Sequence, residues 1–327
     1  MIVQFICRAI LLGVPLLYGS TGEIVTEKSG HLNLGIPGIM YVGAISGVIG
    51  SFLYENATTA ESINGVLAVL IPLICAIAGS TLMGLVYSFL TVTLRANQNV
   101  TGLALTTFGV GLGNFFGGSL IKLTDSEMPS IALTKTSSYF SVKLPFADDL
   151  GAFGEIFLSH DFLTYLAIII ALVVAFVLNR TRVGLNLRAV GENPATADAA
   201  GINVIKYKYV ATCLGSAIAG LGGLQYVMSY ANGVWSNNAF GDRGWMAIAL
   251  VIFALWKPSA AIVGSFIFGA LCNANNYVYG LGAETQELFK MLPYVVTIIV
   301  LVITSMRKKR EHQPPANLGL PYFREER

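Results

Sequence analysis

Residues 180–208 read RTRVGLNLRAVGENPATADAAGINVIKYK, a polar stretch with a long apolar run on either side. Five of its side chains are positively charged, namely Arg180, Arg182, Arg188, Lys206 and Lys208. In membrane proteins, short loops rich in lysine and arginine stay on the cytoplasmic side. The stretch is therefore predicted to be a cytoplasmic loop between two membrane spans.

The same loop is predicted to contain a short helix. Asn193 and Pro194 suit a turn followed by the first helical position. Residues 195–200 are rich in alanine, and Gly201 is placed to end the helix. A short helix held at the cytoplasmic surface suits contact with a soluble partner. The alternative is a solvated loop that only fixes the topology.

The composition is that of an all-α polytopic membrane protein. Of the 327 residues, 54% are apolar and 12% are charged, whereas soluble domains carry roughly 25% charged residues. A bilayer is crossed by ~20 apolar residues. The apolar runs are residues 2–22, 31–54, 66–94, 103–120, 162–178, 209–228, 245–256, 260–279 and 292–306. The four cysteines lie in these runs without metal-like spacing, which favours simple core positions.

The positions of the basic segments predict the orientation of the chain in the membrane. Residues 180–208 and the basic run 307–310 are expected on the cytoplasmic side, so an even number of spans separates them. The short run 245–256 must then cross as well, and residues 122–160 lie outside. The prediction is about nine spans, within a range of eight to ten. Residues 1–306 form the transmembrane domain, and the polar tail 307–327 is predicted to be a disordered cytoplasmic segment.

Glycine and proline interrupt two of the spans, at residues 33–38 and 244–258. Broken helices at membrane depth occur where they line a cavity or are buried in protein. In the predicted topology the two interrupted segments run in opposite directions, one in each half of the chain, as an inverted repeat would require. The alternative is that these glycines only let helices pack closely.

The sequence contains none of the common enzyme motifs. It has no G-x-x-x-x-G-K-[ST] phosphate loop and no H-E-x-x-H zinc motif, so no ATPase site, metal site or catalytic residue is predicted. Arg8 is the one ionisable residue expected inside an apolar run, and proton-coupled carriers usually need intramembrane carboxylates or histidines. Coupling to Na⁺ through backbone carbonyls stays open. What remains is a membrane protein with a neutral interior that receives its energy from another subunit.

Four stretches resemble a known family. They are EKSGHLNLGIPGIM at 27–40, RANQNVTGLALTTFG at 95–109, GLNLRAVGENPATADAAGI at 184–202 and GDRGWMAIALVIF at 241–253. Together they look like nucleoside-type permeases of ABC importers, within a wider group that also serves branched-chain amino acids and ribose. The likeness covers residues 22–306. One departure is Pro37, because the family often has glutamate between the two glycines of this motif.

The resemblance implies a permease subunit without a cofactor of its own, since ATP is used by a separate ATPase. That ATPase would dock on residues 186–201. The implied coupling residues are Arg188, Gly191, Glu192, Asn193, Pro194, Ala195, Ala199 and Gly201. The other implied partners are a second, related permease subunit, an extracellular substrate-binding lipoprotein and membrane lipid. The implied location is the plasma membrane of a bacterial-type cell, and no nucleic-acid partner is expected.

Polar and aromatic side chains in the broken segments are the candidates for the substrate path. They are Asn33, Trp245, Asn273, Asn275 and Asn276. Asparagine in a span can equally hold helices together, and Trp245 can be a membrane-interface residue, as is expected of Trp235. A neutral interior suits a neutral, flat nucleoside. The alternatives are a sugar such as ribose, branched-chain amino acids, a facilitator that needs no ATPase, and a membrane enzyme.

Overall fold

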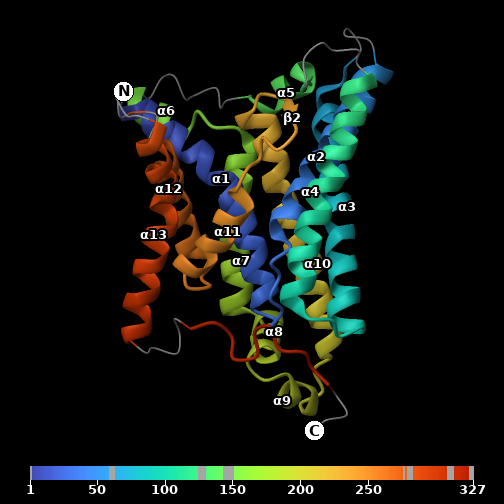
Figure 1. Cartoon of the computed structure of the whole chain (residues 1–327), viewed down its shortest axis with the longest axis vertical. Helices are drawn as coiled ribbons and strands as arrows, with labels where there is room; N and C mark the ends of the chain where they lie inside the picture. The colour runs from blue at the N-terminus through green and yellow to red at the C-terminus, as the bar shows by residue number, and fades with distance from the viewer. Residues whose placement is uncertain are drawn as a thin grey trace.

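The structure is a computed structural model that describes residues 2–58, 63–123, 130–142, 151–274, 277, 283–307 and 313–323. Its long helices lie roughly along one axis (Figure 1). In the described part, six are long and apolar enough to cross a membrane: α1 (Ile2–Glu27), α2 (Ile36–Ala57), α3 (Gly65–Ser88) with η2 (Phe89–Thr93), α4 (Gln98–Leu123), α7 (Phe162–Arg180), and α10 (Val204–Gln225) with η4 (Tyr226–Tyr230).

Three shorter apolar segments follow in the described part of the chain. They are α11 (Arg243–Phe253), α12 (Pro258–Ala274) and the apolar part of α13 (Ala283–Arg307). Each predicted apolar run therefore corresponds to one helical segment. The prediction of an all-α polytopic protein with some broken spans is confirmed.

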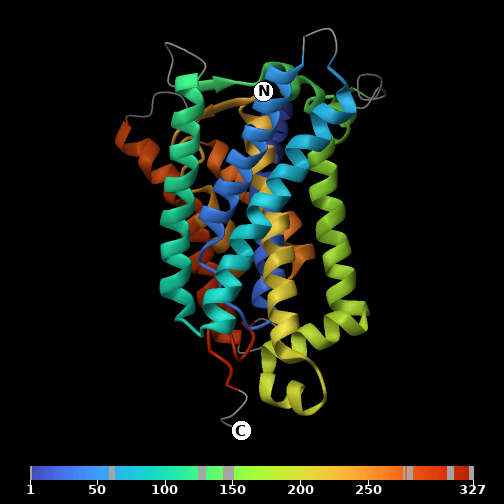
Figure 2. The same ribbon diagram turned by 90° about the vertical axis from the view of Figure 1, so that its right-hand side faces the viewer.

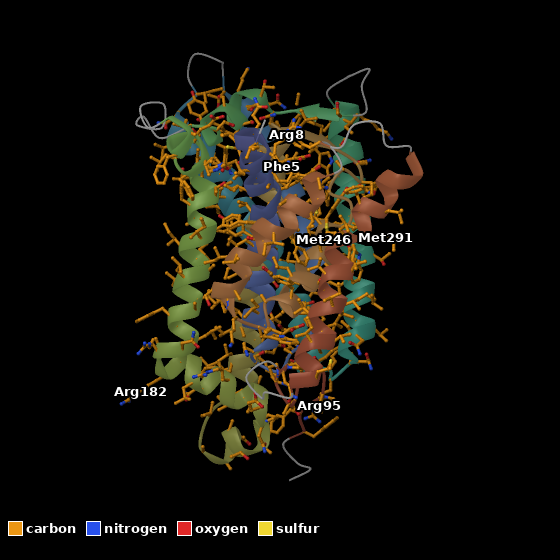
Figure 3. The ribbon with its side chains drawn as sticks, turned by 90° about the vertical axis from the view of Figure 1, so that its left-hand side faces the viewer. Phe5, Arg8, Arg95, Arg182, Met246 and Met291 are labelled. Carbon is orange, nitrogen blue, oxygen red and sulfur yellow. The ribbon has the colours of Figure 1, made fainter. Side chains whose placement is uncertain are left out.

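The two ends of the bundle carry different small elements. The first end holds β1 (Ser130–Ala132), β2 (Val234–Ser236), α5 (Thr134–Phe140) and α6 (Gly151–Phe157), and the second holds α8 (Arg182–Glu192) and α9 (Pro194–Ala199) (Figures 1 and 2). Arg95 and Arg182 lie at the second end and Arg8 at the first (Figure 3). We call the end with α8 and α9 the inner end, and the other the outer end. The described parts of the predicted loop 122–160 thus lie at the end opposite to residues 180–208.

Burial separates the central helices from the peripheral ones. In α2 and α10, 78% and 72% of the apolar window is buried, compared with 28% in α3 and α7. The peripheral helices expose large apolar side chains such as Leu82 and Phe115. Helices that are apolar all round but half exposed are typical of contact with lipid. The core thus lies around α1, α2 and α10.

Close backbone contact fixes α12 against α1. A Cβ at Gly13 would collide with the carbonyl oxygen of Ser265, and one at Gly269 would collide with that of Ala9. Small residues of this kind let transmembrane helices approach closely. Because residue numbers rise in α12 as they fall in α1, the two helices are antiparallel, so α12 runs toward the outer end.

The predicted interruptions are both present, and they meet inside the bundle. The chain between α1 and α2 is irregular and buried, and α2 begins only at the level of Leu105, about 10 Å along α4. At the other interruption, α11 and α12 are joined through Leu255 and Trp256, both with positive φ. Gly244, in the first turn of α11, packs against Pro37 in the first turn of α2. Two helix starts of opposite direction therefore face each other, as an inverted repeat would place them.

Two local predictions need correction. Trp235, expected at a surface, is only 3% exposed, pairs with Ile131 across β1–β2, and its ring centroid lies 5.2 Å from that of Tyr41. The tail was expected to be disordered. Residues 313–323 instead lie along the inner end, where the N–H of Asn317 donates to the Gly191 carbonyl at 3.0 Å and that of Gly319 to the Gly30 carbonyl at 3.3 Å. Backbone pairing of this kind gives residues 313–323 a fixed course that composition does not reveal, whereas residues 308–312 and 324–327 lie outside the described part.

Candidate functional site

The predicted helix in the polar loop is α9, and its ends are built as the sequence indicated. The Oδ1 atom of Asn193 accepts the N–H of Thr196 at 3.0 Å, and Pro194 occupies the first turn. Gly201 follows the helix with φ of +82°, a conformation that favours glycine. These local signals are enough to begin and end a helix of six residues.

One side of α9 is buried and the other is open. Pro194 and Ala197 are buried, and Ala197 packs in a small cluster with Val190 of α8 and Val204 of α10. Ala195, Thr196, Ala199 and Ala200 are exposed. The loop therefore presents a face of small side chains at the inner end, which suits insertion into a groove on another subunit.

The remaining predicted coupling residues support α9. Gly191 is buried, and a Cβ there would collide with the Lys28 carbonyl oxygen and lie 3.0 Å from the Gly30 nitrogen. A carboxylate oxygen of Glu192 accepts the N–H of Ala316 from the tail at 3.3 Å. Arg188 is half-buried, and its Nε has no hydrogen-bond partner within the described residues. Of the predicted coupling residues, Gly191 and Glu192 thus support α9 from neighbouring segments, whereas Ala195 and Ala199 are exposed on it.

Asn33 lies at the start of the first broken segment and is fully buried. Its Oδ1 accepts the N–H of Gly35 at 2.9 Å, and its own N–H donates to Oε1 of Glu23 at 3.0 Å. Its Nδ2 has no partner in the described part of the chain. A buried amide with an unused donor is costly unless something accepts from it, so Asn33 stays a candidate for the substrate path.

Trp245 and Asn273 occupy different places. Trp245 is half-buried and directly follows Gly244, the residue that packs on Pro37. Asn273 instead donates from Nδ2 to the carbonyl of Phe5 at 3.3 Å. Phe5 is 18 residues from Glu23 on α1, which corresponds to about 27 Å. The structure therefore brings Asn33 close to the segment of Trp245 but holds Asn273 near the outer end. Asn275 and Asn276 lie outside the described residues.

The interior carries ionisable groups that the sequence analysis placed elsewhere. The first predicted apolar run ends at residue 22, but α1 continues to Glu27 and buries both Glu23 and Glu27. Glu23 is 0% and Glu27 3% exposed. The indole N–H of Trp256 donates to Glu27. The expectation of a neutral interior was therefore wrong. The four-residue spacing of Glu23 and Glu27 could have indicated this burial, because it places both acids on one face of a helix that continues past residue 22.

The irregular chain after α1 is held by side chains. The ring of His31 bridges Thr212 at 2.8 Å and Thr91 at 2.7 Å. The N–H of Leu32 donates to Oε1 of Gln98 at 2.8 Å, and its carbonyl accepts the hydroxyl of Tyr87. Irregular backbone inside a membrane protein needs such partners. Four buried polar side chains from other elements, Thr91, Thr212, Gln98 and Tyr87, thus stabilise the first break.

His31 is expected to make the stability of the protein depend on pH. Burial, together with the positive charge of Lys208, holds the pKa of His31 at about 3, below its usual 6.5. The neutral ring is favoured in the fold, so its contribution is complete above about pH 6.5 and is lost as the pH falls toward 3, by about 1.4 kcal/mol per pH unit. The melting temperature of purified protein should fall more between about pH 7 and pH 5 than that of His31→Gln. Equal slopes would contradict this role.

Comparison with known proteins agrees with this architecture. The family model described as "Branched-chain amino acid transport system / permease component" matches residues 5–301. The chain is 32% identical to the nucleoside ABC transporter permease protein NupC of Lactococcus lactis, over 91% of each chain. It is 28% identical to the guanosine ABC transporter permease protein NupQ of Bacillus subtilis, over 96% of this chain and 94% of NupQ.

A third relative has another substrate in its name. TsgC13 of Haloferax volcanii, named as a glucose ABC transporter permease, is 35% identical over 78% of this chain and 72% of its own length. The family match spans nearly all of the helical bundle, including both broken segments and the α8–α9 loop. This chain therefore belongs to the branched-chain amino acid transport system permease family, and is a membrane-embedded permease subunit of an ABC transporter.

Proposed function

We propose that this permease carries nucleosides into the cell, driven by a separate ATPase that docks on α9. The observation that carries the proposal is the likeness to NupC and NupQ, whose names give nucleosides and guanosine, over more than nine-tenths of this chain. A second, related permease subunit completes the path, and an extracellular substrate-binding lipoprotein delivers the substrate to the outer end.

The interior chemistry supports a neutral, flat substrate. Asn33 and Glu23 are both fully buried, so a solute that carries charged phosphate groups would meet a desolvation cost beside them. The unused Nδ2 of Asn33 offers a donor to a base carbonyl or a ribose oxygen. Trp245 offers a stacking face of the kind that bases favour. Nucleosides use all three features.

Sugar uptake is the second candidate, because TsgC13 is 35% identical. Competition separates the two: radiolabelled guanosine uptake, in cells that contain the complete importer, is measured against excess unlabelled uridine, ribose, glucose or leucine. Nucleosides should compete and the others should not. Strong glucose uptake that nucleosides do not inhibit would replace the nucleoside by a sugar and leave the permease assignment in place.

Trp245→Ala is expected to lower nucleoside uptake by about five-fold or more, because stacking on a base contributes about 1–3 kcal/mol. Trp245→Phe should keep most of the activity, since it keeps an aromatic face. Initial rates of guanosine uptake at matched membrane levels give the measurement. Phe108→Ala is the control, because Phe108 is 56% exposed on α4. Trp235→Ala is unsuitable, since it removes a buried ring. An unchanged rate in Trp245→Ala would remove this residue from the path.

A further inference from the structure

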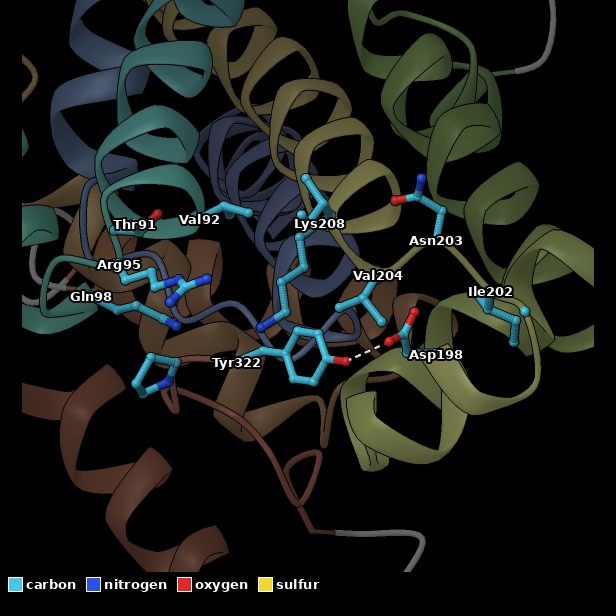
Figure 4. Close-up of a pocket in the computed structure, with 13 residues that line it drawn as sticks. Thr91, Val92, Arg95, Gln98, Asp198, Ile202, Asn203, Val204, Lys208 and Tyr322 are labelled. Atoms are coloured by element: carbon cyan, nitrogen blue, oxygen red, sulfur yellow. Dashed lines mark hydrogen bonds between the residues drawn. The ribbon is translucent and has the colours of Figure 1, made fainter. Parts of the chain in front are cut away.

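A pocket at the inner end is left unexplained by the transport path. It has a volume of about 310 Å³ and lies between the α3–α4 turn, the start of α10 and the tail (Figure 4). Its polar lining comes from all three elements and includes Arg95, Gln98, Lys208 and Tyr322. It adjoins the first break, because Thr91 and Gln98, which hold His31 and Leu32, also line it, but Asn33 and Trp245 do not.

Lys208 is the central feature of the pocket. Its side chain is only 3% exposed and projects into the pocket (Figure 4). Its backbone carbonyl accepts the Thr212 hydroxyl at 2.9 Å, but its ammonium group has no hydrogen bond or ion pair within the described residues. A buried ammonium group without a counter-charge is costly. Lys208 also lies near the amino end of α10, which carries a positive partial charge of its own. Both charges would be balanced by an anion.

The start of α10 adds backbone donors. The Oδ1 atom of Asn203 accepts the N–H of Lys206 at 2.9 Å. The N–H groups of Val204 and Ile205 have no acceptor in the described part of the chain, and both residues line the pocket. Free N–H groups at the amino end of a helix of 22 residues are suited to binding phosphate. Here they occur together with a buried, unpartnered cation.

Arg95 brings a second positive charge to the same place. It lies in the α3–α4 turn with φ of +58°, a costly conformation for a residue other than glycine. Its guanidinium is 4.7 Å from the ring centroid of Phe323. Asp198 of α9 also lines the pocket, and its carboxylate accepts the Tyr322 hydroxyl at 2.8 Å. The formal charges of Arg95, Lys208 and Asp198 leave the pocket net positive.

We propose that this pocket binds a small phosphate-bearing anion at the inner end, with Lys208 and the start of α10 as its main contacts and Arg95 as a second cation. The phosphate belongs to a soluble molecule or to the head group of an anionic phospholipid. The same pocket is lined by Asp198 of α9 and by Tyr322 of the tail. A bound anion would therefore change the contact between Asp198 of α9 and Tyr322 of the tail. Through that contact it would change how the ATPase docks on α9.

The test uses the purified full chain in nanodiscs of phosphatidylcholine, with inorganic phosphate as the probe. The melting temperature should rise with phosphate but not with chloride at equal ionic strength. Lys208→Met should weaken phosphate binding by at least ten-fold, about 1.4 kcal/mol. Lys206→Met is the matched control, because Lys206 is exposed, carries the same charge and lies outside this pocket. It should respond as the wild type does.

A second set of nanodiscs containing phosphatidylglycerol distinguishes the two sources. If inorganic phosphate stabilises the protein in both lipids, the ligand is soluble; if only phosphatidylglycerol does, and only with Lys208 present, it is a lipid head group. Arg95→Gln serves as a second variant if Lys208→Met fails to fold, because Arg95 is exposed. Identical responses of the wild type and the variants to both probes would overturn the proposal. The proposal would also be overturned if only the ATPase, and neither phosphate nor phosphatidylglycerol, stabilised the protein in a Lys208-dependent way. That result would identify a carboxylate of the partner as the occupant of the pocket. No transport is measured, so the result is independent of the nucleoside assignment.

Discussion

Ala199→Trp is expected to abolish uptake while the protein stays folded in the membrane. Ala199 lies on the exposed side of α9, whereas the contacts that hold the helix come from Pro194 and Ala197 on its buried side. An indole at this position adds bulk only where a partner groove would close around the helix. Disturbing a hot spot at the centre of an interface costs about 2 kcal/mol or more and up to about 8 kcal/mol, which is roughly thirty-fold or more in affinity. Uptake and substrate-stimulated ATP hydrolysis by the reconstituted importer should therefore both fall to background.

The control for this result is Asn99→Trp, which adds the same ring to an exposed position at the inner end outside α8 and α9. Gly191→Trp is a different experiment, although both positions belong to the predicted coupling set. Gly191 is buried against the Lys28 carbonyl, so a side chain there would disrupt the support of α9 and lower the amount of folded protein. Normal uptake in Ala199→Trp, at normal membrane levels, would favour a facilitator that needs no ATPase.

Gly244→Ala should also cause a large loss, for a reason inside the bundle. A Cβ at this position would collide with the Cα of Pro37 and lie 2.6 Å from its Cβ. Neither atom can move without shifting the start of α2, and overpacking of this kind costs about 1–3 kcal/mol and sometimes more. The two helix starts would separate, and with them Asn33 and Trp245. We expect at least a ten-fold fall in nucleoside uptake, equivalent to about 1.4 kcal/mol, together with a lower melting temperature.

Gly111→Ala is the matched control for this variant. Gly111 lies in α4, and an added Cβ there meets no atom within 4 Å. Alanine is the better helix former by about 1 kcal/mol, so this variant should be as stable as the wild type or more so. If Gly244→Ala behaved like Gly111→Ala in both measurements, the contact between the two broken segments would have no part in transport.

Interruptions inside apolar runs were readable from the sequence, but what they contact was not. Glycine and proline at residues 33–38 and 244–258 predicted breaks, because such residues end helices locally. That Gly244 rests on Pro37 depends on how α2 and α11 cross, which no local pattern specifies. The contact also gives Pro37 a structural role at a position where the resemblance led us to expect glutamate.

The burial of the Glu23 and Glu27 carboxylates, in contrast, was not predicted from the sequence. Both residues follow the predicted apolar run 2–22, and a neutral interior was expected because burying a carboxylate is costly. The fold repays part of that cost through particular partners, the Asn33 N–H and the Trp256 indole, and the latter is more than 200 residues away in the chain. Only the tertiary structure could supply these donors. The tail is similar, because its hydrogen bonds to Gly30 and Gly191 are absent from any local pattern.

By itself the sequence determined the membrane class, the number of apolar segments, the opposite placement of the loops 122–160 and 180–208, and the helix that Asn193 begins and Gly201 follows. Hydrophobic length, charge and capping residues act within one segment, so they can be read from it. The tertiary structure decided which face of α9 is open, which polar residues share the interior, and that Lys208 lies buried beside the tail. These depend on contacts between segments distant in the chain, and their energies exist only once the helices are packed.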